Sequence, residues 1–232
     1  MSVQPISPGA VVSRIWEIYR DQFLVLIGTA LVLYALQFVV YLLIPGATVA
    51  LAILVAALSI LYQGMVVKLV QDIQDGRRDN SVTDLIRSVE PVFWPLVAVS
   101  LLFGIGVGIG FVLLIIPGLI LLVIWAVVAP VTVVERPGVF HAFGRSRELV
   151  RGNGWRVFGV IVIVFLAVLV ISTAAGLLAS SLGSVGRALV QWAVNAALAP
   201  VTALSASVLY FALLGATPVS PPAGGGVGGR QQ

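Results

Sequence analysis

The sequence contains no cysteine and only one histidine, His141. Without cysteine, the chain can form neither a disulfide nor a thiolate-ligated metal site. A single histidine also excludes a metal site or a proton relay built from several imidazoles, and the lack of a second histidine or a cysteine beside His141 disfavours a nucleophile–base pair or a catalytic metal. We therefore expect no metal, no cofactor and no enzymatic activity.

Charged residues are scarce as well. They make up 9% of the chain, against 60% hydrophobic residues and a mean hydropathy of +1.13, whereas an ordinary soluble domain is roughly 25% charged. Several apolar runs reach the roughly 20 residues that a helix needs to cross a hydrocarbon core of about 30 Å. The composition therefore predicts an all-α integral membrane protein.

The apolar runs predict six transmembrane helices arranged as three hairpins. The expected spans are residues 23–44, 47–70, two within 93–134, 157–182 and 188–214. Pro45-Gly46 closes the first hairpin, and the uncharged stretch 93–134, too long for one span, is expected to turn at Pro117-Gly118. We assign residues 1–214 to a single transmembrane domain and 215–232 to a disordered tail rich in proline and glycine.

A short amphipathic interfacial helix is expected before each hairpin, within residues 7–22, from Ser81 onward, and within 135–156. All three carry the same pair spacing: Arg14 with Glu17, Arg87 with Glu90, and Arg145 with Glu148. The tetrapeptide Ala-Pro-Val-Thr also occurs twice, at 129–132 and 199–202. These features predict a threefold internal repeat, although any basic interfacial helix can carry this common pair.

The positive charges are distributed unevenly between the two sides of the predicted bundle. Twelve of the thirteen Lys and Arg residues lie on the side that holds both termini, and Arg187 alone lies on the other. By the positive-inside rule, both termini are cytoplasmic in a multi-pass protein of the cell membrane. Because these charges flank apolar runs, we expect anionic lipid as a partner and no nucleic acid.

The stretch 116–160 combines a Pro-Gly entry into an apolar run, a basic amphipathic segment and a second apolar run. It resembles the glycerophosphoryl diester phosphodiesterase membrane-domain family and related six-span membrane domains of unknown function, most densely over 116–159. The resemblance implies a membrane module without established chemistry, since the phosphodiesterase reaction belongs to a separate soluble barrel. Relatives often close the last span with a Tyr-x-Asp-Leu-Arg-like end, whereas the chain here has the uncharged Tyr210-Phe-Ala-Leu-Leu.

Two features inside the predicted spans concern helix packing. Gly104, Gly106, Gly108 and Gly110 form two overlapping G-x-x-x-G pairs, which allow close helix approach in lipid; flexibility before the turn is the alternative. Pro130 and Pro200 are expected to kink the fourth and sixth spans.

Gln191 and Asn195 are intramembrane polar residues one turn apart on the last span. They indicate either a substrate path, as in a transporter, or hydrogen bonds to neighbouring helices. The sequence places no ionisable residue mid-membrane, which disfavours coupling to an ion gradient.

The basic segment of residues 135–156 suggests a headgroup site. Its arginines are expected to bind lipid phosphate while Phe143 and Val150 anchor the opposite face; setting the topology alone is the alternative. The expected site comprises Arg145, Arg147, Arg151 and Arg156. The sequence thus favours a non-catalytic membrane scaffold or accessory protein whose basic collar engages anionic lipid, a partner protein or a second copy. The alternative is a small-molecule or lipid transporter.

Overall fold

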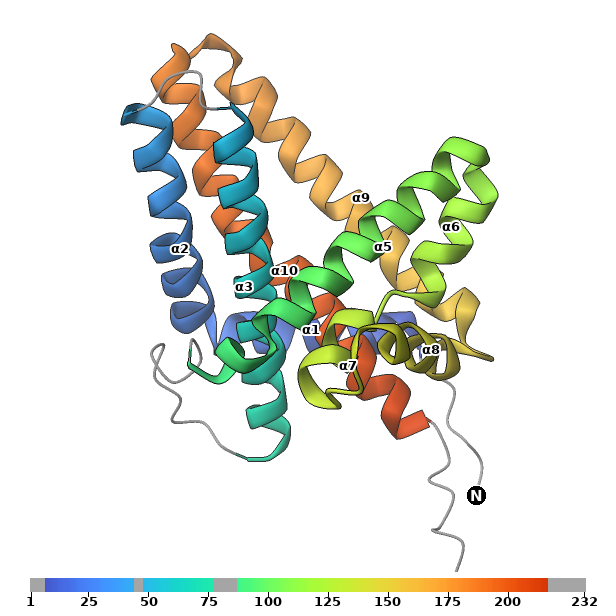
Figure 1. The fold of residues 1–232 in the computed structure, drawn as a ribbon. Helices are drawn as coiled ribbons and strands as arrows, with labels where there is room; N and C mark the ends of the chain where they lie inside the picture. The colour runs from blue at the N-terminus through green and yellow to red at the C-terminus, as the bar shows by residue number, and fades with distance from the viewer. Residues whose placement is uncertain (1–6, 44–47, 77–86, 217–232) are drawn as a thin grey trace, which may run out of the picture.

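The computed structural model describes residues 7–43, 48–76 and 87–216, and every regular element in these ranges is helical (Figure 1). The long helices are α2 (Phe23–Leu43), α3 (Thr48–Gln74), α5 (Phe93–Leu113), α9 (Gly154–Leu178) and α10 (Ser184–Ala216). The shorter ones are α1 (Pro8–Asp21), α6 (Ile115–Ile124), α7 (Val128–Val134) and α8 (Val139–Val150), with 3-10 turns at Glu90–Val92 and Ala179–Ser181.

Five helical stretches are long and apolar enough to cross a membrane. They are Ala52–Gln74, Arg87–Leu113, Ile115–Val134, Gly154–Ser181 and Ser184–Gly215. A sixth candidate is the pair Pro8–Asp21 and Phe23–Ala35, which is bent by 78°. The prediction of an all-helical, multi-pass membrane architecture is confirmed at this level of five to six apolar helices.

Two amphipathic helices, α1 and α8, lie across one end of the long helices (Figure 1). Helix α1 begins where the sequence predicts, because the Ser7 hydroxyl accepts a hydrogen bond from the Ala10 N–H and Pro8 occupies the first turn. Its buried face consists of Val11, Ile15 and Ile18. The third amphipathic helix, expected from Ser81 onward, falls mainly on residues outside the described ranges.

The second hairpin differs from the prediction at its turn. The chain reverses at Leu114, whose backbone is extended (φ −164°, ψ 148°), three residues before the expected Pro117-Gly118 hinge. Pro117 instead lies in the first turn of α6, where a residue without an N–H forfeits no intrahelical hydrogen bond. The proline therefore marks the start of the returning helix and not the turn itself.

The returning half of this hairpin is broken into α6 and α7 by a turn at residues 125–127. Pro130 explains the position of the break, since its ring would clash with the carbonyl four residues earlier, at Ala126. Helix α7 starts two residues before Pro130, and its residues 128–133 are all buried. By contrast, α10 continues through Pro200.

Helix α10 is the element around which the others pack, because it contacts α1, α2, α3, α7, α8 and α9. Its 33 residues correspond to about 50 Å of helix, which exceeds a hydrocarbon core of about 30 Å. The surplus length brings the C-terminal turns of α10 to the level of α7 and α8 (Figure 1).

Candidate lipid-facing site on helix α8

Helix α8 is held rigidly against the α6–α7 turn. A sharp connection precedes it, with positive φ at Arg136 (51°) and Gly138 (90°). On its buried face, the Ser146 hydroxyl donates to the Ile124 carbonyl at 2.9 Å, which satisfies a carbonyl at the end of α6. The Phe143 ring packs edge-on against Trp125, with a centroid distance of 4.9 Å. The orientation of the opposite, outward face is therefore fixed.

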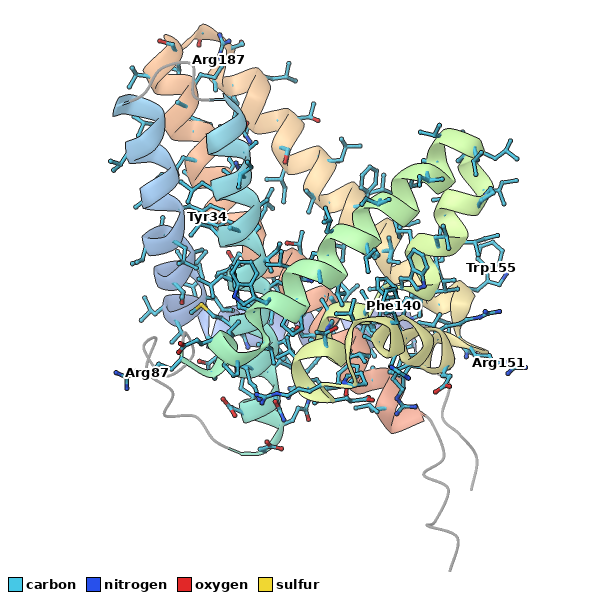
Figure 2. All side chains as sticks on the ribbon, viewed as in Figure 1. Tyr34, Arg87, Phe140, Arg151, Trp155 and Arg187 are labelled. Atoms are coloured by element: carbon cyan, nitrogen blue, oxygen red, sulfur yellow. The ribbon has the colours of Figure 1, made fainter. Side chains whose placement is uncertain are left out.

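That outward face combines large aromatics with arginines. Phe140 on α8 and Trp155 at the start of α9 are 79% and 84% exposed, and Arg147 and Arg151 are exposed beside them. Figure 2 shows Phe140, Arg151 and Trp155 toward the same end of the molecule as Arg87, with Arg187 at the opposite end. Exposed aromatics next to basic groups are typical of the boundary between lipid and water.

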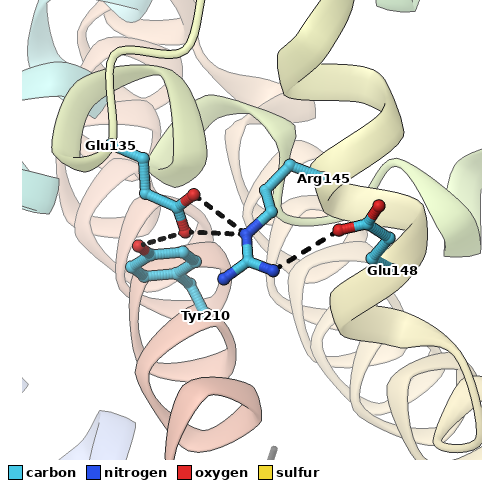
Figure 3. Close-up of polar contacts among 4 residues, drawn as sticks. All are labelled: Glu135, Arg145, Glu148 and Tyr210. Atoms are coloured by element: carbon cyan, nitrogen blue, oxygen red, sulfur yellow. Dashed lines mark hydrogen bonds and ion pairs between the residues drawn. The ribbon is translucent and has the colours of Figure 1, made fainter. Parts of the chain in front are cut away.

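Arg145 is not part of this free basic face. Its Nε lies 2.9 and 3.2 Å from the two carboxylate oxygens of Glu135, and one terminal nitrogen lies 3.4 Å from Glu148 (Figure 3). The Tyr210 hydroxyl, from the end of α10, donates to the same Glu135 carboxylate at 3.0 Å. This cluster ties α10 to the connection between α7 and α8.

Partial burial lowers the pKa of Arg145, but the hydrogen bonds and negative charges of Glu135 and Glu148 outweigh burial and raise the pKa overall. The guanidinium therefore stays charged at any physiological pH, and its charge is compensated within the protein. Arg145 therefore has little uncompensated charge with which to bind an external phosphate.

The four arginines that were expected to form one headgroup site differ in their contacts. Arg145 is ion-paired, and Arg156 donates to the Asn153 side chain at 2.7 Å. Arg147 and Arg151 form no ion pair with any residue in the described ranges. A headgroup site would therefore rest mainly on the exposed Arg147 and Arg151, since Arg145 is neutralised and the half-buried Arg156 has one guanidinium nitrogen engaged by Asn153.

The Glu135–Arg145–Tyr210 cluster is the polar feature that sequence reasoning missed. The Arg145/Glu148 pair follows from helix spacing, but Glu135 lies ten residues from Arg145 and Tyr210 lies 75 residues from Glu135. The only sequence feature that points to this cluster is Tyr210, the first residue of the uncharged stretch that ends the last span. In the structure this tyrosine supplies a hydroxyl to an acidic residue of another element.

The four glycines of α5 separate into two faces. A Cβ atom on Gly106 would lie 2.5 Å from the Trp125 ring, and one on Gly110 would lie 2.9 Å from the Gly118 Cα. Both therefore allow α6 and the following turn to approach α5 closely. At Gly104 and Gly108 such a Cβ would have no atom of another described element within 4 Å, so no described element packs closely at these two positions.

The two amides of α10 bond each other. The Gln191 side-chain nitrogen donates to the Asn195 side-chain oxygen at 3.0 Å, and neither amide bonds a described residue of a neighbouring helix. Asn195 also lines a cavity of about 490 Å³ between α2, α3, α9 and α10, whereas Gln191 does not. No group of three His, Cys, Asp or Glu side chains that could hold a metal occurs among the described residues.

In comparisons with known proteins, no family model, no curated protein and no solved structure matches the chain. The resemblance of residues 116–159 to the glycerophosphoryl diester phosphodiesterase membrane-domain family therefore stays a prediction.

Proposed function

We propose that this protein is a non-catalytic scaffold or accessory protein of the cell membrane, with six spans in three hairpins and both termini in the cytoplasm. In this proposal the outward face of α8 engages anionic lipid through Arg147 and Arg151. The observation that carries the proposal is that these two exposed arginines are unpaired among the described residues and lie beside exposed Phe140 and Trp155.

The expected strength follows from the charges that remain free. Each basic group near an anionic leaflet contributes on the order of 1 kcal/mol, so two unpaired arginines contribute about 2 kcal/mol. That energy corresponds to about 30-fold in affinity. Arg145 is expected to add little because Glu135 and Glu148 already compensate its charge.

The test is native mass spectrometry of the purified protein with added phosphatidylglycerol. The Arg147→Gln/Arg151→Gln double variant should bind phosphatidylglycerol about 30-fold more weakly than wild type, with the two charge contributions summed as above. Arg187→Gln is the control for the loss of an arginine charge, because Arg187 lies at the opposite end of the molecule from Arg151 (Figure 2). Arg147→Lys/Arg151→Lys should keep most of the affinity, since the positive charge is retained.

Equal phosphatidylglycerol retention in wild type and in the Arg147→Gln/Arg151→Gln variant would overturn the lipid-binding role. The two arginines would then serve only to set the membrane topology. A protein partner or a second copy on this face would instead appear as a stable complex that the double variant loses while its lipid retention is unchanged.

The alternative function is transport of a small molecule or lipid. What favours it is the cavity beside Asn195. None of the side chains that line this cavity is a carboxylate, histidine, lysine or arginine, so no group there would carry a coupled proton. Transport would therefore not be driven by a proton gradient through this cavity.

A further inference from the structure

The cavity between α2, α3, α9 and α10 combines apolar walls with several uncharged polar side chains. Among them are Tyr34, Ser59, Gln63, Ser172, Asn195 and Thr202. Its volume of about 490 Å³ falls within the range of small-molecule sites in proteins, about 300–1,000 Å³.

The cavity lies near the middle of the apolar layer. Tyr34 is eleven residues after Phe23, the first residue of α2, which corresponds to about 16 Å along the helix. That distance is about half of a hydrocarbon core of about 30 Å. Figure 2 shows Tyr34 between the level of Arg187 at one end and that of Arg87 and Arg151 at the other.

Part of this polar lining is already satisfied within the protein. The Tyr34 and Ser59 hydroxyls lie 3.1 Å apart and bond each other. The Thr202 hydroxyl donates to the Ala199 carbonyl on its own helix at 2.9 Å. These groups shape the cavity and need no occupant.

Three other polar side chains, on three different helices, retain unused hydrogen-bonding capacity. The Gln63 amide on α3 and the Ser172 hydroxyl on α9 have no partner among the described residues. Asn195 on α10 accepts from Gln191, but its own amide nitrogen donates to no described residue. Because polar groups at membrane depth require partners, this convergence indicates a polar occupant.

The lining also defines the charge of that occupant. A charged ligand would find no counter-charge, since no lining residue is ionised, and an uncompensated charge in a low-dielectric site is strongly disfavoured. Amides and hydroxyls both donate and accept, as hydroxyl groups of a ligand do. The chemistry therefore fits an uncharged group with several hydroxyls.

The direction in which the cavity opens indicates what kind of molecule bears these hydroxyl groups. Helix α3 packs on α2 and α10, and α9 packs on α10, but α3 and α9 do not pack along each other although both line the cavity. The cavity therefore opens between them, toward the hydrocarbon. We infer that it binds the hydroxyl-bearing headgroup of an uncharged lipid, with the acyl chain leaving between α3 and α9.

The test uses the full chain in phosphatidylcholine nanodiscs and monooleoylglycerol with a diazirine in its acyl chain as the probe. Three unlabelled competitors share the oleoyl chain and differ in the headgroup: monooleoylglycerol has two hydroxyls, oleate has a charge, and methyl oleate has neither. We expect saturable labelling of α3 and α9, with monooleoylglycerol competing at a concentration at least tenfold lower than the other two.

Variants locate the binding. Gln63→Leu and Asn195→Leu should each reduce labelling at least tenfold. Gln71→Leu is the matched control, because Gln71 lies two turns along α3, outside the cavity, where it accepts a hydrogen bond from Lys68. Ser172→Ala removes one hydroxyl without adding bulk. It therefore tests whether the probe binds in this cavity even where a leucine variant fails to fold.

Three results would overturn the inference. Labelling that does not saturate would mean that the cavity holds only water. Equal competition by the three oleoyl compounds would mean that any apolar chain suffices, and stronger competition by oleate would contradict the requirement for an uncharged ligand. Unchanged labelling in the correctly folded Asn195→Leu and Ser172→Ala variants would place the probe elsewhere.

Discussion

Replacing the α5 glycines one at a time with alanine gives a direct measurement of how closely α5 and α6 approach. The four positions alternate along one helix, and the structure separates them sharply. A Cβ atom would come within 2.9 Å of the Gly118 backbone at Gly110 and within 2.5 Å of the Trp125 ring at Gly106. At Gly104 and Gly108 it would meet no other described element within 4 Å.

The magnitude follows from a comparison in which a common term cancels. Alanine is the better helix former by about 1 kcal/mol at every interior helix position, so this gain applies to all four variants. The difference that remains is overpacking, typically about 1–3 kcal/mol. Gly110→Ala should therefore be about 1–3 kcal/mol less stable than Gly108→Ala, or about 5- to 150-fold in the unfolding equilibrium constant.

Relaxation cannot easily relieve either clash. At Gly110 the opposing atoms belong to the Gly118 backbone, which cannot rotate away. At Gly106 the Trp125 ring lies between Phe103 and Phe143, with centroid distances of 6.5 and 4.9 Å. Gly106→Ala should therefore also be less stable than Gly104→Ala.

The assay is reversible unfolding of each variant in detergent micelles by titration with sodium dodecyl sulfate, followed by far-ultraviolet circular dichroism. We expect the Gly104→Ala and Gly108→Ala proteins to be at least as stable as wild type. Gly106→Ala should be less stable than Gly104→Ala, and Gly110→Ala less stable than Gly108→Ala. Equal stability of the Gly108→Ala and Gly110→Ala proteins would refute the close approach of α5 and α6. A large loss at Gly104 or Gly108 would refute the open outer face of α5.

Two further predictions concern the polar cluster and the topology. Tyr210→Phe should lower the free energy of unfolding by about 1–2 kcal/mol, which is at the lower end for a hydrogen bond to a charged group because Glu135 is partly exposed. In a Glu135→Gln background the same Tyr210→Phe change should lower the free energy of unfolding much less. Equal losses in the two backgrounds would contradict the hydrogen bond between Tyr210 and Glu135. For topology, Ser184→Cys should react with an impermeant maleimide on intact cells and Gln74→Cys only after lysis, whereas the reverse pattern would contradict cytoplasmic termini.

Composition and local pattern determined much of this protein. A chain that is 60% hydrophobic and 9% charged indicates a membrane protein, and a helix bonds the backbone groups of each span internally, which is required because hydrocarbon provides no other partner for them. The start of α1 and the amphipathic faces of α1 and α8 also follow from signals within one or two turns, namely Ser7, Pro8 and the spacing of apolar residues. Such signals act over short distances along the chain, so they are readable without the fold.

The tertiary structure decided which of the predicted residues act together. Arg145 has the same sequence pattern as an exposed lipid-binding arginine, yet Glu135 and Glu148 compensate its charge. The two G-x-x-x-G pairs are equivalent in sequence, but only Gly106 and Gly110 face α6 and its turn. Gln63, Ser172 and Asn195 belong to three helices and meet only when α3, α9 and α10 assemble. Hydrogen bonds, ion pairs and steric contacts act over a few ångströms in space, and distance along the chain does not determine them.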